Sequence, residues 1–314
     1  NMILQTGQRT DIPAFYSLWL ANRIEEGYVM VRNPYQPLSV TKYLINPDVI
    51  DGIAFCSKNP RPFFPYLSVL EPYREYWHMT ITLYGRDIEP NVPPYEQVLE
   101  NFIFLSERIG PKAMTWRYDP IIINETYTFD VHVKRFTEMA ERLKGHTDTV
   151  IVSFIDLYDK VRRNFPQAIR PPVELQRSLI TELVQIAKFN HMTLKTCGEG
   201  SVFADVGADS TGCLTKEVYE QAFGVTLSLP TRQPSREECN CYLHGDIGAY
   251  DSCAHFCQYC YANTNQANVR QAMKLHNPTS PFLIGHALPQ DVVKEANQQS
   301  WIVEPKPQQD SFQF

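Results

Sequence analysis

Short apolar runs alternate with longer amphipathic stretches through the first two thirds of the chain. The apolar runs are rich in β-branched and aromatic residues, as expected of strands that are buried on both faces of a parallel sheet. Gly27, Gly110 and Gly145 stand just past three of the amphipathic stretches, where helices commonly end. The predicted strands are residues 2–6, 50–56, 77–84, 113–118, 149–155 and 192–196.

Repeated alternation of strands and helices predicts a parallel sheet with right-handed crossovers. Six or seven such units within roughly 250 residues favour an α/β fold of the TIM-like type, a partial or complete parallel β/α barrel. A doubly wound open sheet is the main competitor, but the glycine-rich fingerprint of its dinucleotide-binding form is missing. Residues 28–48 are predicted to form a long loop or an edge hairpin.

The composition divides the chain into three parts. Residues 1–197 contain the barrel units. Residues 198–252 bear several cysteines and few apolar runs, and their one predicted helix covers residues 216–223 with Thr215 as its N-cap. We interpret this part as an insertion around an auxiliary metal site. Residues 253–314 contain a cysteine triplet, a closing helix and a polar tail.

Three cysteines near the C-terminus follow the spacing C-x3-C-x2-C. They are Cys253, Cys257 and Cys260, with Tyr259 just before the last one. Three thiolates in one short loop can hold three corners of a cubane iron–sulfur cluster and leave the fourth iron open to a small molecule. The alternative is a structural zinc ion, but zinc needs a fourth ligand, and the nearby His255 is awkwardly placed to supply it.

Four further cysteines from separated segments form a second candidate metal site. They could close all corners of an auxiliary 4Fe–4S cluster, which we favour, or bind one zinc ion. Cys56 ends an apolar run and is predicted to be a buried apolar side chain. The members of this second set are Cys197, Cys213, Cys239 and Cys241.

The net charge and the positions of the cysteines limit the partners and the compartment that we expect for this protein. The net charge is -6 and the pI about 5.8, so no strong basic field attracts nucleic acid. No apolar run reaches the roughly 18 residues that span a bilayer, and no signal peptide is visible. Seven of the eight cysteines crowd after residue 196, which favours metal ligation in a reducing cytoplasm over a disulfide scaffold.

Polar side chains follow five consecutive predicted strands, at the edge where barrel enzymes place their reactive groups. Arg117, Asp119 and Asp156 are the first candidates for catalytic residues among them. The alternative is that they are helix caps and salt bridges that support loops, such as Arg117 with Asp119 or Asp156.

Several short stretches of sequence carry a resemblance to a known family. They are residues 9–16, 57–60, 116–120, 153–158 and 246–250, then the triplet and residues 261–263. These stretches resemble a bacterial family known as domain of unknown function 1848, and they run in family order over most of the chain. The cysteine triplet is also similar to the C-x3-C-x-aromatic-C signature of radical S-adenosylmethionine (SAM) enzymes.

The triplet lies near the C-terminus, whereas in ordinary radical SAM enzymes it follows the first barrel strand. A circular permutation would explain this order, because barrel termini lie close together. The segment before Cys253 would then supply the first strand, and residues 2–6 the second. The resemblance implies that Arg9, Thr10 and Asp11 contact the amino group of SAM and that Tyr259 lies near its adenine.

The resemblance implies an enzyme that reduces SAM at a 4Fe–4S cluster and generates a 5′-deoxyadenosyl radical. This radical would abstract hydrogen from an unknown small-molecule or peptide substrate. The implied electron donor is an external reductant such as a flavodoxin or ferredoxin. The alternative is a non-enzymatic zinc or iron–sulfur protein with a structural or redox-sensing role.

Overall fold

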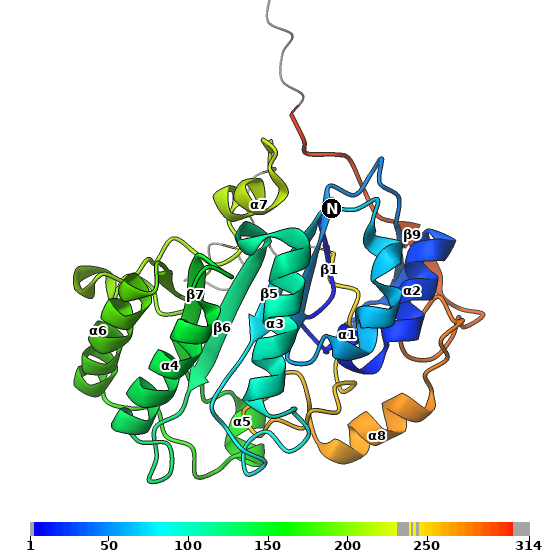
Figure 1. The fold of residues 1–314 in the computed structure, drawn as a ribbon. Helices are drawn as coiled ribbons and strands as arrows, with labels where there is room; N and C mark the ends of the chain where they lie inside the picture. Colours follow the sequence, from blue (N-terminus) through cyan, green and yellow to red (C-terminus); the bar gives the residue numbers. More distant parts are fainter. Residues whose placement is uncertain (1–2, 231–238, 240, 243–244, 304–314) are drawn as a thin grey trace, which may run out of the picture.

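The computed structural model describes residues 3–230, 239, 241–242 and 245–303. Its centre is a six-stranded sheet whose strands all run parallel, in the order β1-β4-β5-β6-β7-β8 (Figure 1). All six predicted strands are therefore present, with ends shifted by up to four residues; Met2 lies outside the described residues. The strands are β1 (Ile3–Gln5), β4 (Gly52–Ser57), β5 (Glu75–Thr80), β6 (Met114–Ile121), β7 (Thr149–Phe154) and β8 (Thr193–Thr196).

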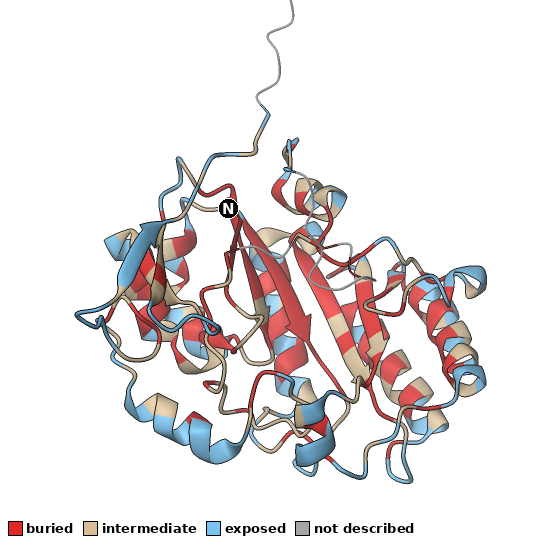
Figure 2. Ribbon diagram, turned by 180° about the vertical axis from the view of Figure 1, so that it is seen from behind, coloured by how far each residue is buried: buried red, intermediate tan, exposed pale blue. Residues whose placement is uncertain are grey.

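The main crossover helices pack side by side on one face of this sheet (Figure 1). Seen from behind, the opposite face of the sheet is not covered by these helices (Figure 2). A doubly wound sheet has helices on both faces, so this arrangement differs from the competing fold. The helices and 3-10 helices before β8 are α1 (Ile12–Phe15), α2 (Ser17–Glu26), η1 (Arg61–Leu70), α3 (Tyr95–Ile109), η2 (Pro111–Ala113), α4 (Phe129–Leu143), α5 (Asp159–Asn164) and α6 (Val173–Phe189).

The alternation of side chains along β6 separates the two faces. Trp116 and Tyr118 are buried against Phe136 of α4. Their neighbours Arg117 and Asp119 are only partly buried and lie on the opposite face. We call this opposite face, which carries the polar strand residues, the open face of the sheet.

Residues 245–247 extend the sheet beyond β1. Gln5 and Asp246 form a parallel bridge. Gln5 N–H donates to Gly245 O at 3.1 Å, and Ile247 N–H donates to Gln5 O at 3.0 Å. The segment before the cysteine triplet is thus the neighbour of β1, as the permuted strand order predicts. No pairing joins this segment to β8 in the described residues, so a closed barrel is not observed.

A second sheet of three strands lies beside the first. Two of its strands form an antiparallel hairpin, which confirms the hairpin alternative for residues 28–48; the third was not predicted. The strands are β2 (Tyr28–Arg32), β3 (Ser39–Leu44) and β9 (Val292–Glu295).

The remaining elements frame the cysteine-bearing segments. The helix α7 (Lys216–Phe223) has the predicted bounds, and Thr215 caps it by accepting a hydrogen bond from Val218 N–H. It packs on β5, against the open face. Also present are η3 (Ala204–Val206) and α8 (Gln266–Lys274). Over the described ranges, each helix is too short or too polar to cross a bilayer.

Candidate functional site

The cysteine triplet occupies the loop that follows residues 245–247. The thiols of Cys253, Cys257 and Cys260 are close enough for charge on one to disfavour charge on another. Burial, followed by the nearby Asp11 carboxylate, raises the pKa of Cys253 to about 12. Burial also raises the pKa of the other two thiols. A bound cation would reverse this balance, because a coordinating thiol is deprotonated.

Asp11 fastens the triplet loop to the ends of β1 and β4. Its carboxylate is 2.7 Å from His255 Nε2 within the loop. It also accepts hydrogen bonds from Ser57 Oγ at 2.7 Å, from Lys58 N–H at 2.8 Å and from Ala14 N–H at 3.2 Å. With these partners Asp11 positions the loop, and its predicted contact with a cofactor stays a prediction.

Among the residues that the structure describes, four buried polar atoms on the triplet loop and on the stretch after β1 lack a hydrogen-bond partner. Two of them belong to the stretch after β1, and two to the loop itself. Their gathering is unusual, because buried polar groups in proteins are nearly always paired. The loop is otherwise well bonded: Asn263 Nδ2 donates to Cys253 O at 2.8 Å, and Ala262 N–H donates to Cys260 Sγ at 3.4 Å. The four atoms are Gln8 Nε2, Thr10 Oγ1, His255 Nδ1 and Asn263 Oδ1.

The chain after β1 passes very close to β4. A Cβ added at Gly7 would lie 2.3 Å from the carbonyl oxygen of Cys56, so this position requires glycine. The charge of the Arg9 side chain is already paired. It forms an ion pair of 2.6 Å with Asp246 and lies over the ring of Tyr250.

Lys58 and Glu89 form a polar network beside Cys257. Lys58 Nζ lies 2.9 Å from Glu89 Oε1, and Thr82 Oγ1 donates to the same oxygen at 2.8 Å. The Tyr259 hydroxyl also bonds to it, which orients the aromatic residue of the triplet motif. Lys58 is one of the polar side chains predicted at the strand ends, whereas Glu89 was not predicted, because it stands in a loop with no pattern to mark it.

The structure brings two of the three predicted catalytic residues together. Arg117 and Asp119 form an ion pair of 2.6 Å on the open face. Ser153 Oγ donates to Asp119 at 3.3 Å, and Arg117 Nη1 lies 3.3 Å from His78 Nδ1. Burial, and then the Arg117 charge, lower the pKa of His78 well below its usual value, so this ring is neutral.

Asp156 lies apart from that pair. Its carboxylate forms an ion pair with Arg170 at 3.1 Å and is partly exposed. Arg170 also pairs with the buried Glu199, which in turn accepts from Phe154 N–H at 2.9 Å. Asp156 therefore belongs to a salt-bridge network after β7, which is the loop-supporting alternative considered for it.

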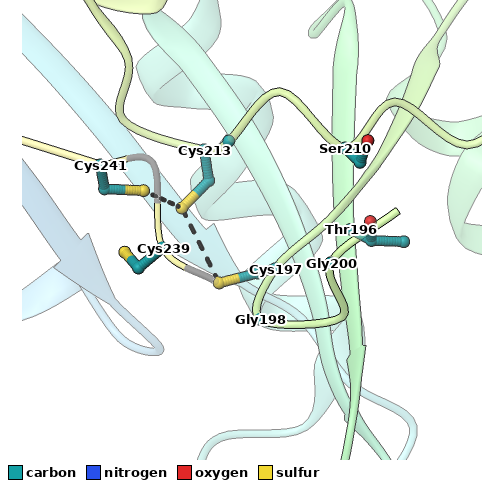
Figure 3. A pocket seen from close by; sticks show the side chains of 9 residues that line it. Thr196, Cys197, Gly198, Gly200, Ser210, Cys213, Cys239 and Cys241 are labelled. Carbon is teal, nitrogen blue, oxygen red and sulfur yellow. Dashed lines mark hydrogen bonds between the residues drawn. The ribbon is translucent and has the colours of Figure 1, made fainter. Parts of the chain in front are cut away.

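The four cysteines of the second set line one small cavity (Figure 3). Cys213 Sγ lies 3.2 Å from Cys241 Sγ and 3.9 Å from Cys197 Sγ. The hydrogen bond to Cys213 lowers the pKa of Cys241, but the bond to Cys239 and burial outweigh it and raise this pKa to about 11. In the described part of the chain, no group of three or more His, Cys, Asp or Glu side chains already surrounds a point as metal ligands do.

Arg117 connects the two regions. Its Nη1 lies 3.8 Å from Cys213 Sγ, while its partner Asp119 acts electrostatically on Lys58, beside the triplet. The open face between the two cysteine sets therefore carries a partly buried cation and a partly buried carboxylate.

A family model described as a domain of unknown function (DUF1848) matches residues 3–262. This range includes all seven cysteines of the two sets. No curated protein and no solved structure matches the chain.

Proposed function

The chain belongs to the DUF1848 family, and from that premise we propose that it is a radical SAM enzyme. In this proposal Cys253, Cys257 and Cys260 bind a 4Fe–4S cluster through three irons, and SAM binds at the fourth. When bound, the cluster and SAM supply an electron and a 5′-deoxyadenosyl radical, which is chemistry that protein side chains lack. The substrate is a small molecule or peptide of unknown identity.

The unpartnered buried polar atoms on the triplet loop and on the stretch after β1 carry this proposal, since the Asp11–His255 bond holds these two segments together. Each such atom costs about 1–3 kcal/mol when it stays unpaired. The cost disappears if a polar ligand binds there. Thr10 Oγ1 and Asn263 Oδ1 can accept hydrogen bonds from an amino group, and Gln8 Nε2 can donate one to a carboxylate. SAM carries both of these groups.

The residues around the triplet would hold and orient the bound molecule. Asp11 keeps the loop against β1 and β4 through its bond to His255. Glu89 fixes the hydroxyl of Tyr259, so the ring has one orientation in which to meet an adenine. Backbone N–H donation to Cys260 Sγ favours the thiolate form that iron requires.

Arg117 and Asp119 would face the substrate. They lie on the open face of the sheet, beside neutral His78 and the hydroxyl of Ser153. Arg117 can bind an anionic or carbonyl group of the substrate, because its guanidinium carries several donors. We propose that the enzyme works in the cytoplasm with an external reductant such as a flavodoxin or ferredoxin.

Cleavage of SAM by anaerobically reconstituted protein tests the proposal. With dithionite as reductant, the wild type should convert SAM to 5′-deoxyadenosine and methionine. Cys257→Ala should lose this activity and the triplet iron. Cys56→Ala is the matched control for iron binding, because Cys56 belongs to neither set, and it should keep the iron.

Absence of SAM cleavage after spectroscopy has verified the triplet cluster would refute the enzyme. Stoichiometric zinc on the triplet, with no affinity for SAM, would instead support the non-enzymatic metal protein.

A further inference from the structure

We propose that the second cysteine set, Cys197, Cys213, Cys239 and Cys241, binds one tetrahedral metal ion, with Zn²⁺ as the natural occupant, and not a second iron–sulfur cluster. This inference is independent of the radical SAM proposal, because it concerns other residues and another metal. It reverses the preference for an auxiliary cluster that the sequence favours.

The distances between the thiols carry the inference. Tetrahedral zinc with Zn–S bonds of about 2.3 Å places its sulfur ligands roughly 3.8 Å apart. The two measured separations around Cys213 are 3.2 and 3.9 Å, which bracket that value. In a cubane each cysteine binds a different iron, so the cysteine sulfurs lie much farther apart, at roughly 6 Å.

The space between the thiols also favours a single metal ion. The cavity that they line has a volume of about 10 Å³, close to that of one water-sized sphere. A single ion needs no more room, whereas a cubane of eight atoms would require Cys213 Sγ to move away from Cys241 Sγ and Cys197 Sγ. The walls include Gly198 and Gly200 (Figure 3) and also Gly212. None of these glycines has a side chain that could swing aside to enlarge the cavity.

The backbone already joins two of the ligand-bearing segments. Leu214 N–H donates to Cys241 Sγ at 3.3 Å, and Tyr242 N–H donates to Leu214 O at 2.9 Å. The thiols do not yet surround one point. Metal binding would draw them together, since each thiol loses its proton to the solvent and becomes an anion attracted to the ion.

Charge and location suggest a structural role for this ion. Four thiolates and one Zn²⁺ leave a net charge of −2 in a buried place, and Arg117 Nη1 at 3.8 Å from Cys213 Sγ partly offsets it. The ion would tie the end of β8 to the segments on either side of α7. It would thereby hold α7 over the open face, next to the residues proposed to meet substrate.

Metal analysis of full-length protein purified without oxygen tests the inference. The wild type should contain about one zinc and about four irons per chain, one ion and one cubane. Cys213→Ser should lose the zinc and keep the iron. The triple variant Cys253→Ala, Cys257→Ala, Cys260→Ala should keep the zinc and lose the iron, so failure of either proposal is visible separately.

A second measurement needs no variant of the second set. After removal of zinc with a chelator, titration of the triple variant with Co²⁺ should give the visible bands of tetrahedral thiolate cobalt, saturating at one equivalent. About eight irons per chain without zinc would overturn the inference. Loss of iron in Cys213→Ser with the zinc retained, or no metal and no cobalt bands in the triple variant, would also overturn it.

Discussion

The buried ion pair of Lys58 and Glu89 predicts a large effect of one substitution on the stability of the protein. Their side chains are only 14% and 2% exposed. Lys58→Ala leaves the Glu89 carboxylate buried without its cation, and loss of one partner of such a pair costs about 3–5 kcal/mol. We expect this loss in the free energy of unfolding, measured with urea under one set of buffer and metal conditions.

The matched control is Arg177→Ala. Arg177 pairs with Asp205 at 2.7 Å, but the two side chains are 40% and 69% exposed. An exposed pair contributes about 1 kcal/mol or less. Equal losses in the two variants would show that Lys58 is hydrated in solution and that the network beside Cys257 is not formed as described.

Thr10 gives a prediction with opposite signs for stability and binding. Its hydroxyl is buried and has no hydrogen-bond partner within the described part of the chain. Thr10→Val removes this unpaired group at nearly constant volume, so the free energy of unfolding without SAM should rise or stay unchanged, by about 0–1 kcal/mol. Binding of SAM should weaken by about 10- to 150-fold, since a hydrogen bond to a charged group contributes about 1.5–3 kcal/mol. Equilibrium dialysis of the reconstituted protein measures it.

Thr147→Val is the control for that substitution. Thr147 is equally buried, but its hydroxyl donates to Met114 O at 2.7 Å. The same change of atoms should therefore lower stability by about 1 kcal/mol and leave SAM binding unchanged. If Thr10→Val destabilises the protein as much as Thr147→Val does, the Thr10 hydroxyl has a protein partner and the support for a ligand there is lost.

At the scale of the element, apolar runs and caps could be predicted, and weak or irregular elements could not. The strands of the main sheet are short runs rich in β-branched and aromatic residues, and Thr215 marks the start of α7, so both were found. β9 is fully exposed, so it has no apolar pattern to recognise. The 3-10 helix η1 contains Pro65, which argues against a helix when only the sequence is known.

The contact between α4 and β6 predicts a pH dependence of stability. His132 of α4 accepts from the Tyr118 hydroxyl at 2.8 Å and donates to Ile122 O at 2.7 Å. Burial lowers its pKa from 6.5 to about 4. Between these values the unfolded chain binds a proton that the folded protein does not, so stability falls as the pH drops below 6.5.

His132→Gln should reduce this loss, because glutamine does not titrate. Between pH 7 and pH 5 the variant should lose about 2 kcal/mol less of its unfolding free energy than the wild type, as given by linkage. Urea denaturation at both pH values measures the difference. Parallel losses in the two proteins would mean that other groups cause the acid sensitivity.

At the scale of the whole molecule, the two cysteine sets were predictable in membership but not in geometry. Spacing along the chain groups Cys253, Cys257 and Cys260, because they share one loop. It cannot give distances between segments, so the close approach of Cys213 to Cys197 and Cys241 needed the fold. The same holds for Glu89, which long-range folding brings to Tyr259.

An ion pair supports the pairing of residues 245–247 with β1. Arg9 and Asp246 pair at 2.6 Å, with side chains 14% and 10% exposed, where residues 245–247 lie beside β1. A double-mutant cycle of Arg9→Ala and Asp246→Ala should give an interaction energy of about 1–3 kcal/mol in urea unfolding. Arg9→Ala with Asp205→Ala should be additive within about 0.5 kcal/mol, because Asp205 pairs with Arg177 far along the chain. Additivity in the first cycle as well would show that the C-terminal segment does not complete the sheet, and the proposed site, which needs residues 8–10 beside the triplet loop, would lose its framework.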